Sequence, residues 1–242
     1  MSRLSHALRR LGETPPTLPE RITVNGVEAV CDPLGGLYLP EDKVLIVSDL
    51  HLEKGSAFAR RGMMLPPYDT LMTLKLLEVL IARHDPKVVI SLGDAFHDRK
   101  GAAHMPAPFR AMIETMARGR EWIWITGNHD PEAPAGLPGQ SLEMLRLNGL
   151  TFRHEPEAGT AAGEIAGHLH PAATVRRRET LVRRACFATD GARLVMPAFG
   201  VTTGGMDLAH RAFSGLFEQA RLMAHMLGRD RIYSVRFDRL LA

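Results

Sequence analysis

The stretch Val44–His51, which reads VLIVSDLH, decides the fold that this sequence predicts. It begins with four consecutive apolar residues, three of them β-branched, which is typical of a strand buried in a sheet. The strand runs into Asp49 and His51, so a carboxylate and an imidazole follow it two residues apart. Such a pair can bind a divalent metal ion that accepts both oxygen and nitrogen ligands. Alone the pair is a weak signal, because a capping aspartate beside a surface histidine has the same spacing.

A strand followed by a glycine and a ligand-type residue occurs three times further along the chain. The predicted strands at 88–92, 122–126 and 165–166 run into Gly93-Asp94, Gly127-Asn128-His129-Asp130 and Gly167-His168-Leu169-His170. Open α/β sheets bind their ligands at the carboxyl ends of the strands. We therefore expect these polar residues to converge on one metal site.

Length and composition limit the class of protein. At 242 residues, 45% of them hydrophobic and 24% charged, the chain has the make-up of a soluble globular protein. We expect a single domain over residues 1–242, with a loosely packed arm over residues 1–20. No apolar run reaches the ~18 residues of a membrane span, and no apolar segment follows the basic N-terminus. A cytoplasmic enzyme without a membrane partner is the expectation.

The metal ligands cannot be thiolates. Cys31 and Cys186 are the only cysteines, too few for a disulfide framework or a cysteine-based zinc site. Any metal ion must therefore be held by Asp, Asn and His.

Positive charge is concentrated in the last third of the chain. Residues 1–170 carry 18 Lys and Arg against 21 Asp and Glu, whereas residues 171–242 carry 12 Arg against 6 Asp and Glu. The densest part is Arg176–Arg178 with Arg183 and Arg184. Guanidinium groups suit phosphate recognition, which favours an anionic polymer as partner. Alternatively, these strands simply direct their arginines into solvent, and charge alone does not separate the two readings.

Local patterns predict the remaining elements. Hairpins are expected over 22–30, with a type I′ turn at Asn25-Gly26, and over 142–154, around Asn148-Gly149. Helices are expected over 68–84, 108–118 and 214–227. A basic loop is expected over 52–62, and strands over 172–178, 183–189, 194–198 and 232–237. Strands alternate with helices early and form antiparallel hairpins late, which predicts an α/β sandwich of two mixed β-sheets flanked by helices.

Taken in order, the motifs resemble those of the calcineurin-like metallophosphoesterases. They are Asp49-x-His51, Gly93-Asp94, Gly127-Asn128-His129-Asp130, the strand-ending His154 and Gly167-His168-x-His170. Every ligand position of that superfamily's pattern is filled. The resemblance implies one metal ion held by Asp49, His51 and His170, a second held by Asn128, His154 and His168, and Asp94 as the bridge between them.

The resemblance also implies the chemistry. A hydroxide between two divalent ions attacks the phosphorus atom, and His129 faces the phosphate as general acid or charge stabiliser. Asp94 and His129 are thus the expected catalytic residues. His97 and Asp98 fit less clearly, since Asp98 either orients a ligand imidazole or caps the following turn. The remaining histidines, His84, His104, His210 and His225, fit no motif and are expected to be structural or exposed.

A narrower resemblance covers nearly the whole chain. The blocks that carry it are Asp32–Tyr38, Asp49–Ser56, Arg60–Gly62, Leu65–Thr70, Gly93–Asp98 and Pro197–Gly200. They are similar to the bacterial ligase-associated metallophosphoesterases called PdeM. This implies a manganese-dependent endonuclease of DNA repair that cuts single-stranded or unpaired DNA, associated with an ATP-dependent DNA ligase and a helicase. Fe, Zn and Co also suit Asp, Asn and His ligands.

Four basic residues lie in loops near the motif ends. Lys54, Arg60, Arg61 and Arg99 could hold flanking phosphates of the substrate, or they could form structural salt bridges.

Two other functions remain open. One is a phosphodiesterase or pyrophosphatase that acts on a small nucleotide or a lipid-linked diphosphate. The other is a non-catalytic repair scaffold, which predicts eroded ligand positions, whereas none is eroded here.

Overall fold

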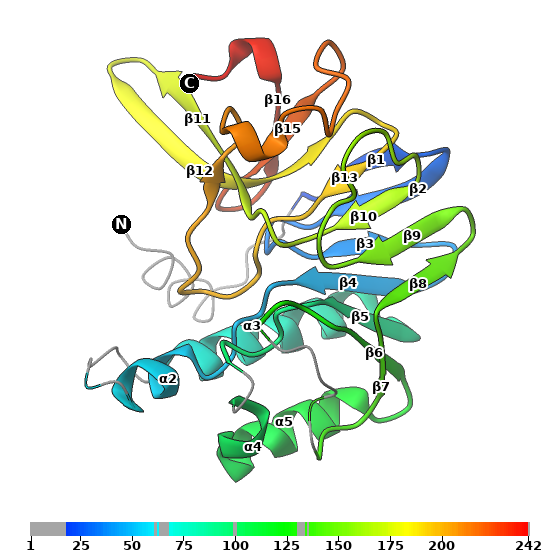
Figure 1. Ribbon diagram of the computed structural model, residues 1–242, viewed down its shortest axis with the longest axis vertical. Coiled ribbons are helices and arrows are strands. Elements are labelled where there is room, and N and C mark those ends of the chain that lie inside the picture. The colour runs from blue at the N-terminus through cyan, green and yellow to red at the C-terminus, as the bar shows by residue number, and fades with distance from the viewer. Residues whose placement is uncertain are drawn as a thin grey trace.

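Two β-sheets pack face to face, and helices cover the outer face of the first sheet (Figure 1). The computed structural model describes residues 18–60, 62, 68–98, 101–129, 134 and 136–241, without the side chains of 59 and 60. The predicted α/β sandwich of two mixed sheets is confirmed. Within the described ranges, no helix is long and apolar enough to cross a membrane.

The first sheet follows the order of the chain. Its strands are β1 (Glu20–Val24), β2 (Val27–Cys31), β3 (Leu37–Leu39), β4 (Val44–Ser48), β5 (Val88–Leu92), β6 (Glu121–Ile125) and β7 (Gln140–Leu142). Pairing is antiparallel from β1 to β4 and parallel from β4 to β7. The connecting helices are α2 (Lys54–Arg60), α3 (Asp69–His84), α4 (Gly101–His104) and α5 (Ala107–Ala117). The predicted helices over 68–84 and 108–118 are therefore present as α3 and α5.

The second sheet is built from the later strands. They are β8 (Met144–Leu147), β9 (Leu150–Arg153), β10 (Glu164–Ala166), β11 (Pro171–Arg177), β12 (Thr180–Thr189), β13 (Leu194–Val195), β14 (Met206–Asp207), β15 (Met223–Leu227) and β16 (Ile232–Arg236). The spatial order is β14-β11-β12-β13-β10-β9-β8, and β15 pairs with β12 and β16. The long strand β12 thus joins the β11 hairpin to the centre of the sheet.

Strand β4 lies between two apolar layers. Leu45 and Val47 of β4 face α3 and α5, whereas Val44 and Ile46 face the second sheet. All four side chains are fully buried, which explains why the strand is apolar throughout instead of alternating. A third apolar cluster lies on the other face of the second sheet and includes Phe213, Leu216 and Leu222.

The expected basic loop after His51 is instead the helix α2, because tertiary contacts complete its first turn. The carboxylate of Asp69, at the start of α3, accepts a hydrogen bond from the Gly55 amide at 2.8 Å. The Glu53 carbonyl accepts from the Ala57 amide at 2.9 Å, and Ser56 Oγ donates to the Glu53 carboxylate at 2.6 Å. An acceptor 14 residues away cannot be read from a local pattern.

The helix expected over 214–227 is wrong. A short 3₁₀-helix, η1 (Arg211–Phe213), and turns occupy its first part, and β15 occupies its end. Gly215, at φ +76°, leaves the helical region, and Leu216 and Leu222 pack against the sheet from these turns. Strand pairing of β15 with both β12 and β16 outweighs the helical spacing of the apolar residues.

The predicted strand over 142–147 is split between the two sheets. Leu142 ends β7, which pairs with β6, and Met144 begins β8, which pairs with β9. The chain therefore passes from the first sheet to the second at Glu143. Both Asn-Gly hairpins are present, with positive φ at Asn25, Gly26, Asn148 and Gly149 as a type I′ turn requires.

The expected arm falls mostly outside the described residues, which begin at Leu18. Leu18 forms a bridge with Arg231, and Glu20 is the first residue of β1.

Candidate metal centre

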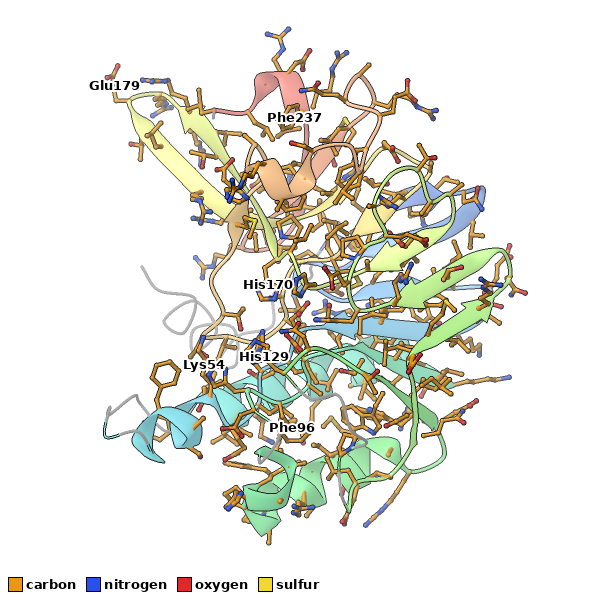
Figure 2. The ribbon with its side chains drawn as sticks, in the orientation of Figure 1. Lys54, Phe96, His129, His170, Glu179 and Phe237 are labelled. Carbon is orange, nitrogen blue, oxygen red and sulfur yellow. The ribbon has the colours of Figure 1, made fainter. Side chains whose placement is uncertain are left out.

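Strand ends from both sheets meet at one edge of the sandwich. From the first sheet, β4 leads to Asp49 and His51, β5 to Asp94, and β6 to Asn128 and His129. From the second sheet, β9 leads to His154, and β10 leads to His168 and His170. Figure 2 shows His129 and His170 facing the same region from opposite sheets. The structure thus brings all the predicted ligand residues to one place.

These residues form two groups whose ligand-type atoms lie close together. Asp49, His51 and His170 each offer an atom within 4.8 Å of the others, and so do Asp94, His154 and His168. Each group combines a carboxylate from the first sheet with at least one imidazole from the second. Asn128 belongs to the second group, because its Oδ1 lies 2.9 Å from His154 Nε2.

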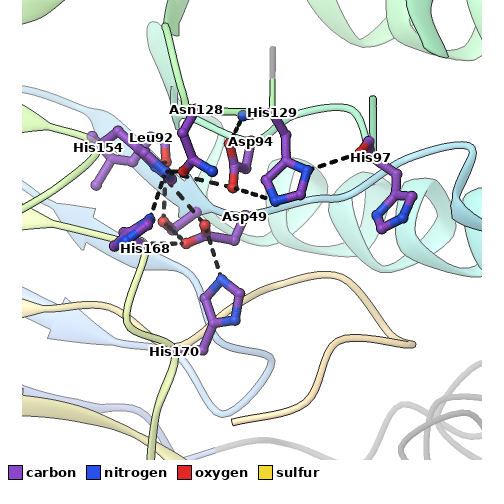
Figure 3. A network of polar contacts seen from close by, with 10 residues as sticks. Asp49, Leu92, Asp94, His97, Asn128, His129, His154, His168 and His170 are labelled. Carbon is purple, nitrogen blue, oxygen red and sulfur yellow. Dashed lines mark hydrogen bonds and ion pairs between the residues drawn. The ribbon is translucent and has the colours of Figure 1, made fainter. Parts of the chain in front are cut away.

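Asp49 uses its two oxygens differently (Figure 3). Oδ2 accepts hydrogen bonds from Ser48 Oγ and from the His168 amide, the latter at 3.0 Å. Oδ1 lies 3.0 Å from His170 Nε2. Because Oδ2 is held by the chain, Oδ1 is fixed in the direction of the first group.

The two carboxylate oxygens of Asp94 also have different partners. Its Oδ1 accepts from the His129 amide at 2.9 Å, while Oδ2 lies 3.5 Å from His154 Nε2 and 3.9 Å from His129 Nε2. Asp94 therefore contacts the second group and the expected catalytic histidine at once.

Two backbone carbonyls set the orientation of the key imidazoles. His154 Nδ1 lies 3.2 Å from the Leu92 carbonyl, and His129 Nδ1 lies 3.0 Å from the His97 carbonyl. A carbonyl can only accept, so Nδ1 carries the proton in each ring and Nε2 is turned toward the carboxylates. Around His154 Nε2 lie Asn128 Oδ1 and also His168 Nδ1, at 3.1 Å. One N–H could satisfy only one of these atoms, whereas a cation would satisfy them all.

The donor set fits divalent metal ions. Asp49 Oδ1, His170 Nε2 and His51 Nδ1 are buried and have no hydrogen bond of good geometry within the described residues. Buried polar atoms of this kind require a partner, and carboxylate, amide and imidazole donors suit Mn, Fe, Co or Zn.

The electrostatics of the site favour cations. Burial raises the pKa of Asp94, but hydrogen bonding and charge from His154 outweigh it and lower this pKa to about 2. Burial lowers the pKa of His154, but the Asp94 hydrogen bond and the charges of Asp49 and Asp94 raise it to about 9. Burial lowers the pKa of His51 to about 4, so this ring is neutral and keeps a lone pair. Both carboxylates are ionised at neutral pH, because the pKa of Asp49 is lowered as well.

Backbone conformations at the site are unusual. Asp49, His51, Asp94, His168 and His170 all have positive φ, between 44° and 65°. Each such residue costs on the order of 1–3 kcal/mol, and such residues cluster at functional sites. The left-handed conformation turns the chain sharply at the strand end and aims the side chain back across it.

The motif glycines are required by close approach. A Cβ at Gly93 would lie 2.3 Å from His154 Nδ1, and one at Gly167 would lie 1.9 Å from Ser48 Oγ and 2.6 Å from Asp49 Oδ2. These glycines therefore let the side chains of the two sheets reach one another.

Of the four predicted phosphate-binding residues, only Lys54 has a described side chain. Its Nζ donates to the Thr202 carbonyl at 3.2 Å, in the loop that follows Gly200. Arg60 ends α2, but its side chain is outside the described part, as are Arg61 and Arg99 altogether.

Sequence reasoning missed the residues that hold the ligands. Ser48 and the Leu92 carbonyl orient Asp49 and His154, and both lie at strand ends directly before a motif, which is the signal that could have indicated them. His97 contributes its carbonyl, and its ring stacks on His129 with centroids 5.6 Å apart. The backbone carbonyl of Asp98 accepts a hydrogen bond from the Gly101 amide at the start of α4. Whether the Asp98 carboxylate orients a ligand imidazole or caps the turn remains a prediction.

Known proteins resemble this chain in sequence or in fold. A family model described as calcineurin-like phosphoesterase matches residues 42–180, a span that contains every predicted ligand. The crystal structure of Pseudomonas putida nuclease MPE matches with a TM-score of 0.68 and 26% identity, over 90% of this chain and 100% of that chain. Yfce, a phosphoesterase from E. coli, aligns over 80% and 98% at 16% identity, with a TM-score of 0.40. No curated protein sequence matches the chain.

Proposed function

This chain belongs to the calcineurin-like phosphoesterases, metal-dependent hydrolases of phosphoester bonds, and from that premise we propose that it is a two-metal DNA endonuclease. The observation that carries the proposal is the pair of ligand groups, one around Asp49 and one around Asp94, built by both sheets. Similarity to a nuclease over nearly the full length of both chains supports a nucleic acid as substrate.

Each residue of the site receives a role in this proposal. Asp49, His51 and His170 hold one ion, Asn128, His154 and His168 hold the other, and Asp94 serves both. Two bound divalent ions would polarise the phosphoryl oxygens and lower the pKa of the attacking water. Asn128 supplies a neutral oxygen, which limits the negative charge of the site and favours an anionic substrate.

His129 acts on the phosphate side of the site. Its Nδ1 proton is held by the His97 carbonyl, so Nε2 is the atom available to the substrate. Because Nδ1 already holds one proton, Nε2 donates a hydrogen bond or a proton to the leaving oxygen when the ring carries a second proton, as the imidazolium. The ring is 41% exposed at its side chain, as a group that meets a bound substrate must be.

The biological setting follows the same proposal. We place the enzyme in the cytoplasm of a bacterium, in DNA repair, with manganese as the metal and single-stranded or unpaired DNA as substrate. An ATP-dependent DNA ligase and a helicase are the proposed partners.

The test is Mn²⁺-dependent nicking of circular single-stranded DNA, which has no ends and therefore reports only an endonuclease. The unaltered protein should cut, whereas Asp94→Ala and His129→Ala should not. His104→Ala, a change at an exposed histidine of α4, is the matched control and should cut normally. Turnover of bis-p-nitrophenyl phosphate without any nicking would move the substrate to a small nucleotide. No metal-dependent turnover of either substrate would favour the scaffold.

A further inference from the structure

The β11–β12 hairpin begins at the metal centre and leads away from it. Pro171, the first residue of β11, directly follows His170, and the strand continues to Arg177. At about 3.3 Å per residue, the hairpin reaches about 23 Å from His170 to its tip. Figure 2 shows Glu179, at the tip, far from His170, and Figure 1 shows the hairpin projecting from the second sheet.

This hairpin carries an isolated concentration of positive charge. Residues 171–189 contain five arginines and one glutamate, a net charge of +4, whereas residues 1–170 have more acidic than basic residues. Arg176, Arg177 and Arg178 at the tip are exposed. Among the described residues, no hydrogen bond or ion pair holds these three side chains. Structural salt bridges therefore do not account for them.

The register connects the tip to the metal centre along one face. Thr174 pairs with Arg183, and Arg176 pairs with Leu181, so Arg176 and Arg183 lie on the same face of the hairpin. Arg183 donates to the Gly205 carbonyl at 2.7 Å. The next residue, Met206, donates its amide to the His170 carbonyl at 2.8 Å. Arg183 therefore lies near a proposed metal ligand, and Arg176 lies on the same face of the hairpin near its tip.

The tip keeps an arginine where a smaller residue would fit better. Arg178 has φ +55°, a conformation that glycine or asparagine adopts at lower cost in a hairpin turn. Arg178 combines a strained backbone with an exposed side chain that has no hydrogen bond or ion pair to the described residues, which favours a role outside the fold.

We propose that the β11–β12 hairpin is an arm that binds the phosphate backbone of the DNA strand on one side of the cleaved bond. This rests on the proposed DNA substrate and adds a binding surface to it. Arginine forks match phosphate oxygens, and backbone contacts of this kind position the strand without reading its sequence. The tip lies about 23 Å along the hairpin from His170, so only a strand long enough to extend that far from the metal centre contacts the tip arginines. The contribution of the arm therefore depends on the length of the DNA.

The test compares two triple variants of equal charge. One combines Arg176→Gln, Arg177→Gln and Arg178→Gln at the tip. The control combines Lys87→Gln, Arg118→Gln and Arg146→Gln, which are exposed and lie away from the strand ends that build the metal centre. Fluorescence anisotropy with chelator present gives the affinity for labelled oligothymidylates of 30 and 4 nucleotides. Bis-p-nitrophenyl phosphate turnover with Mn²⁺ checks the metal centre.

The tip variant should bind the 30-mer about tenfold more weakly or worse, and its log–log salt slope should fall by about 2. The 4-mer and the aryl ester should be unaffected, and the control triple should behave as the unaltered protein on all substrates. Arg178→Gly separates folding from binding, since its melting temperature should be equal or higher while its affinity for the 30-mer falls.

Two results would overturn the proposal that the hairpin binds DNA. One is equal affinity of both triple variants for the 30-mer, and the other is no binding of the 30-mer by the unaltered protein. Binding that depends on the tip arginines, in a protein that does not nick circular DNA, would overturn the endonuclease and leave the arm in place.

Discussion

The two sheets contribute differently to the metal centre. The first sheet supplies both carboxylates, the amide and one imidazole, that of His51, from three neighbouring parallel strands. The second sheet supplies three imidazoles, from the ends of β9 and β10. Neither sheet holds a complete group, because each group needs an oxygen donor from one and a nitrogen donor from the other. The site therefore exists only when the sandwich is closed, and metal binding is coupled to the packing of the sheets.

The change with the largest expected effect removes the negative charge of Asp94, at the end of the central parallel strand β5. Asp94→Asn keeps the shape of the side chain but loses the anion shared by His154 and His129. Turnover of bis-p-nitrophenyl phosphate with Mn²⁺ should fall by about 10²–10³-fold. Asp85→Asn, at an exposed aspartate, should leave the rate unchanged. A variant at position 94 with more than a tenth of normal activity would contradict the central role of this carboxylate.

The second prediction concerns the contact between Gly93 of the first sheet and His154 of the second. Gly93→Ala places a methyl group 2.3 Å from His154 Nδ1, so the imidazole must move away from the first sheet. A displacement of about 1 Å costs on the order of 10²-fold in rate. Gly119→Ala is the matched control, because Gly119 has a similar φ, +72°, with nothing within 4 Å of the added methyl group. Equal activity of the two variants would show that the close contact between position 93 and His154 does not set the reaction rate.

The third prediction concerns the interior of the second sheet. Arg193 and Glu164 form an ion pair at 2.9 Å, with 1% and 2% of their side chains exposed. Arg193 also donates to the Leu216 and Glu157 carbonyls. Arg193→Met leaves Glu164 Oε1 and both carbonyls without their buried donor, while Arg153 remains 3.5 Å from Glu164 Oε2. The change should cost about 3–5 kcal/mol. Thermal unfolding should then occur about 6–20 °C lower.

The matched control for that change is the exposed ion pair of the first sheet, between Arg21 and Glu28. Arg21→Met should cost at most about 1 kcal/mol, because solvent screens the pair. Equal losses in the two variants would mean that burial does not set the strength of these pairs.

The fourth prediction uses the metal ions as a clamp between the sheets. An ion present at 100 times its dissociation constant stabilises the folded protein by about 2.7 kcal/mol. Removal with a chelator should therefore lower the melting temperature by about 5–10 °C per ion. In the Asp94→Asn protein the chelator should have a smaller effect. An equal shift in both proteins would mean that the ions bind elsewhere.

The smallest expected effect concerns the attachment of α3 to the first sheet. Asp32 is fully buried and accepts hydrogen bonds from Arg83 and from the Leu34 amide, and it lies 3.0 Å from His84 Nε2. Burial raises its pKa, but His84 and Arg83 outweigh this and lower it below the usual 3.8. Asp32→Asn should cost about 1–3 kcal/mol at neutral pH.

The sign of the pH dependence follows from that lowered pKa. A carboxyl whose pKa is lower in the folded state adds stability above its unfolded pKa, near 4, and loses it as the pH falls through the folded value. Unfolding in urea at several pH values should show the cost of Asp32→Asn shrinking below about pH 4. A cost that stays constant to lower pH would show that the charge of Asp32 does not contribute.

The two sheets also differ in how well they could be predicted. In the first sheet, a strand such as β4 is apolar throughout and ends directly in its ligands, so strand and ligands are visible in one local pattern. In the second sheet, the segment after Ser214 has helical spacing yet forms turns and β15, because pairing with β12 and β16 provides its partners. Local spacing predicts an element well where the element buries both faces and poorly where distant partners decide.

The sequence by itself determined the two mixed sheets and the ligand types at the strand ends, because buried strands and motif residues are encoded within a few residues of one another. Only the tertiary structure decided how these groups are held. The Leu92 carbonyl sets the proton position of His154 from 62 residues away, and the space that Gly93 leaves open is filled by that same ring. Likewise, Asp69 turns the stretch after His51 into a helix. Such contacts join residues far apart in the chain, and hydrogen-bond geometry and close packing are defined only once the two sheets have met.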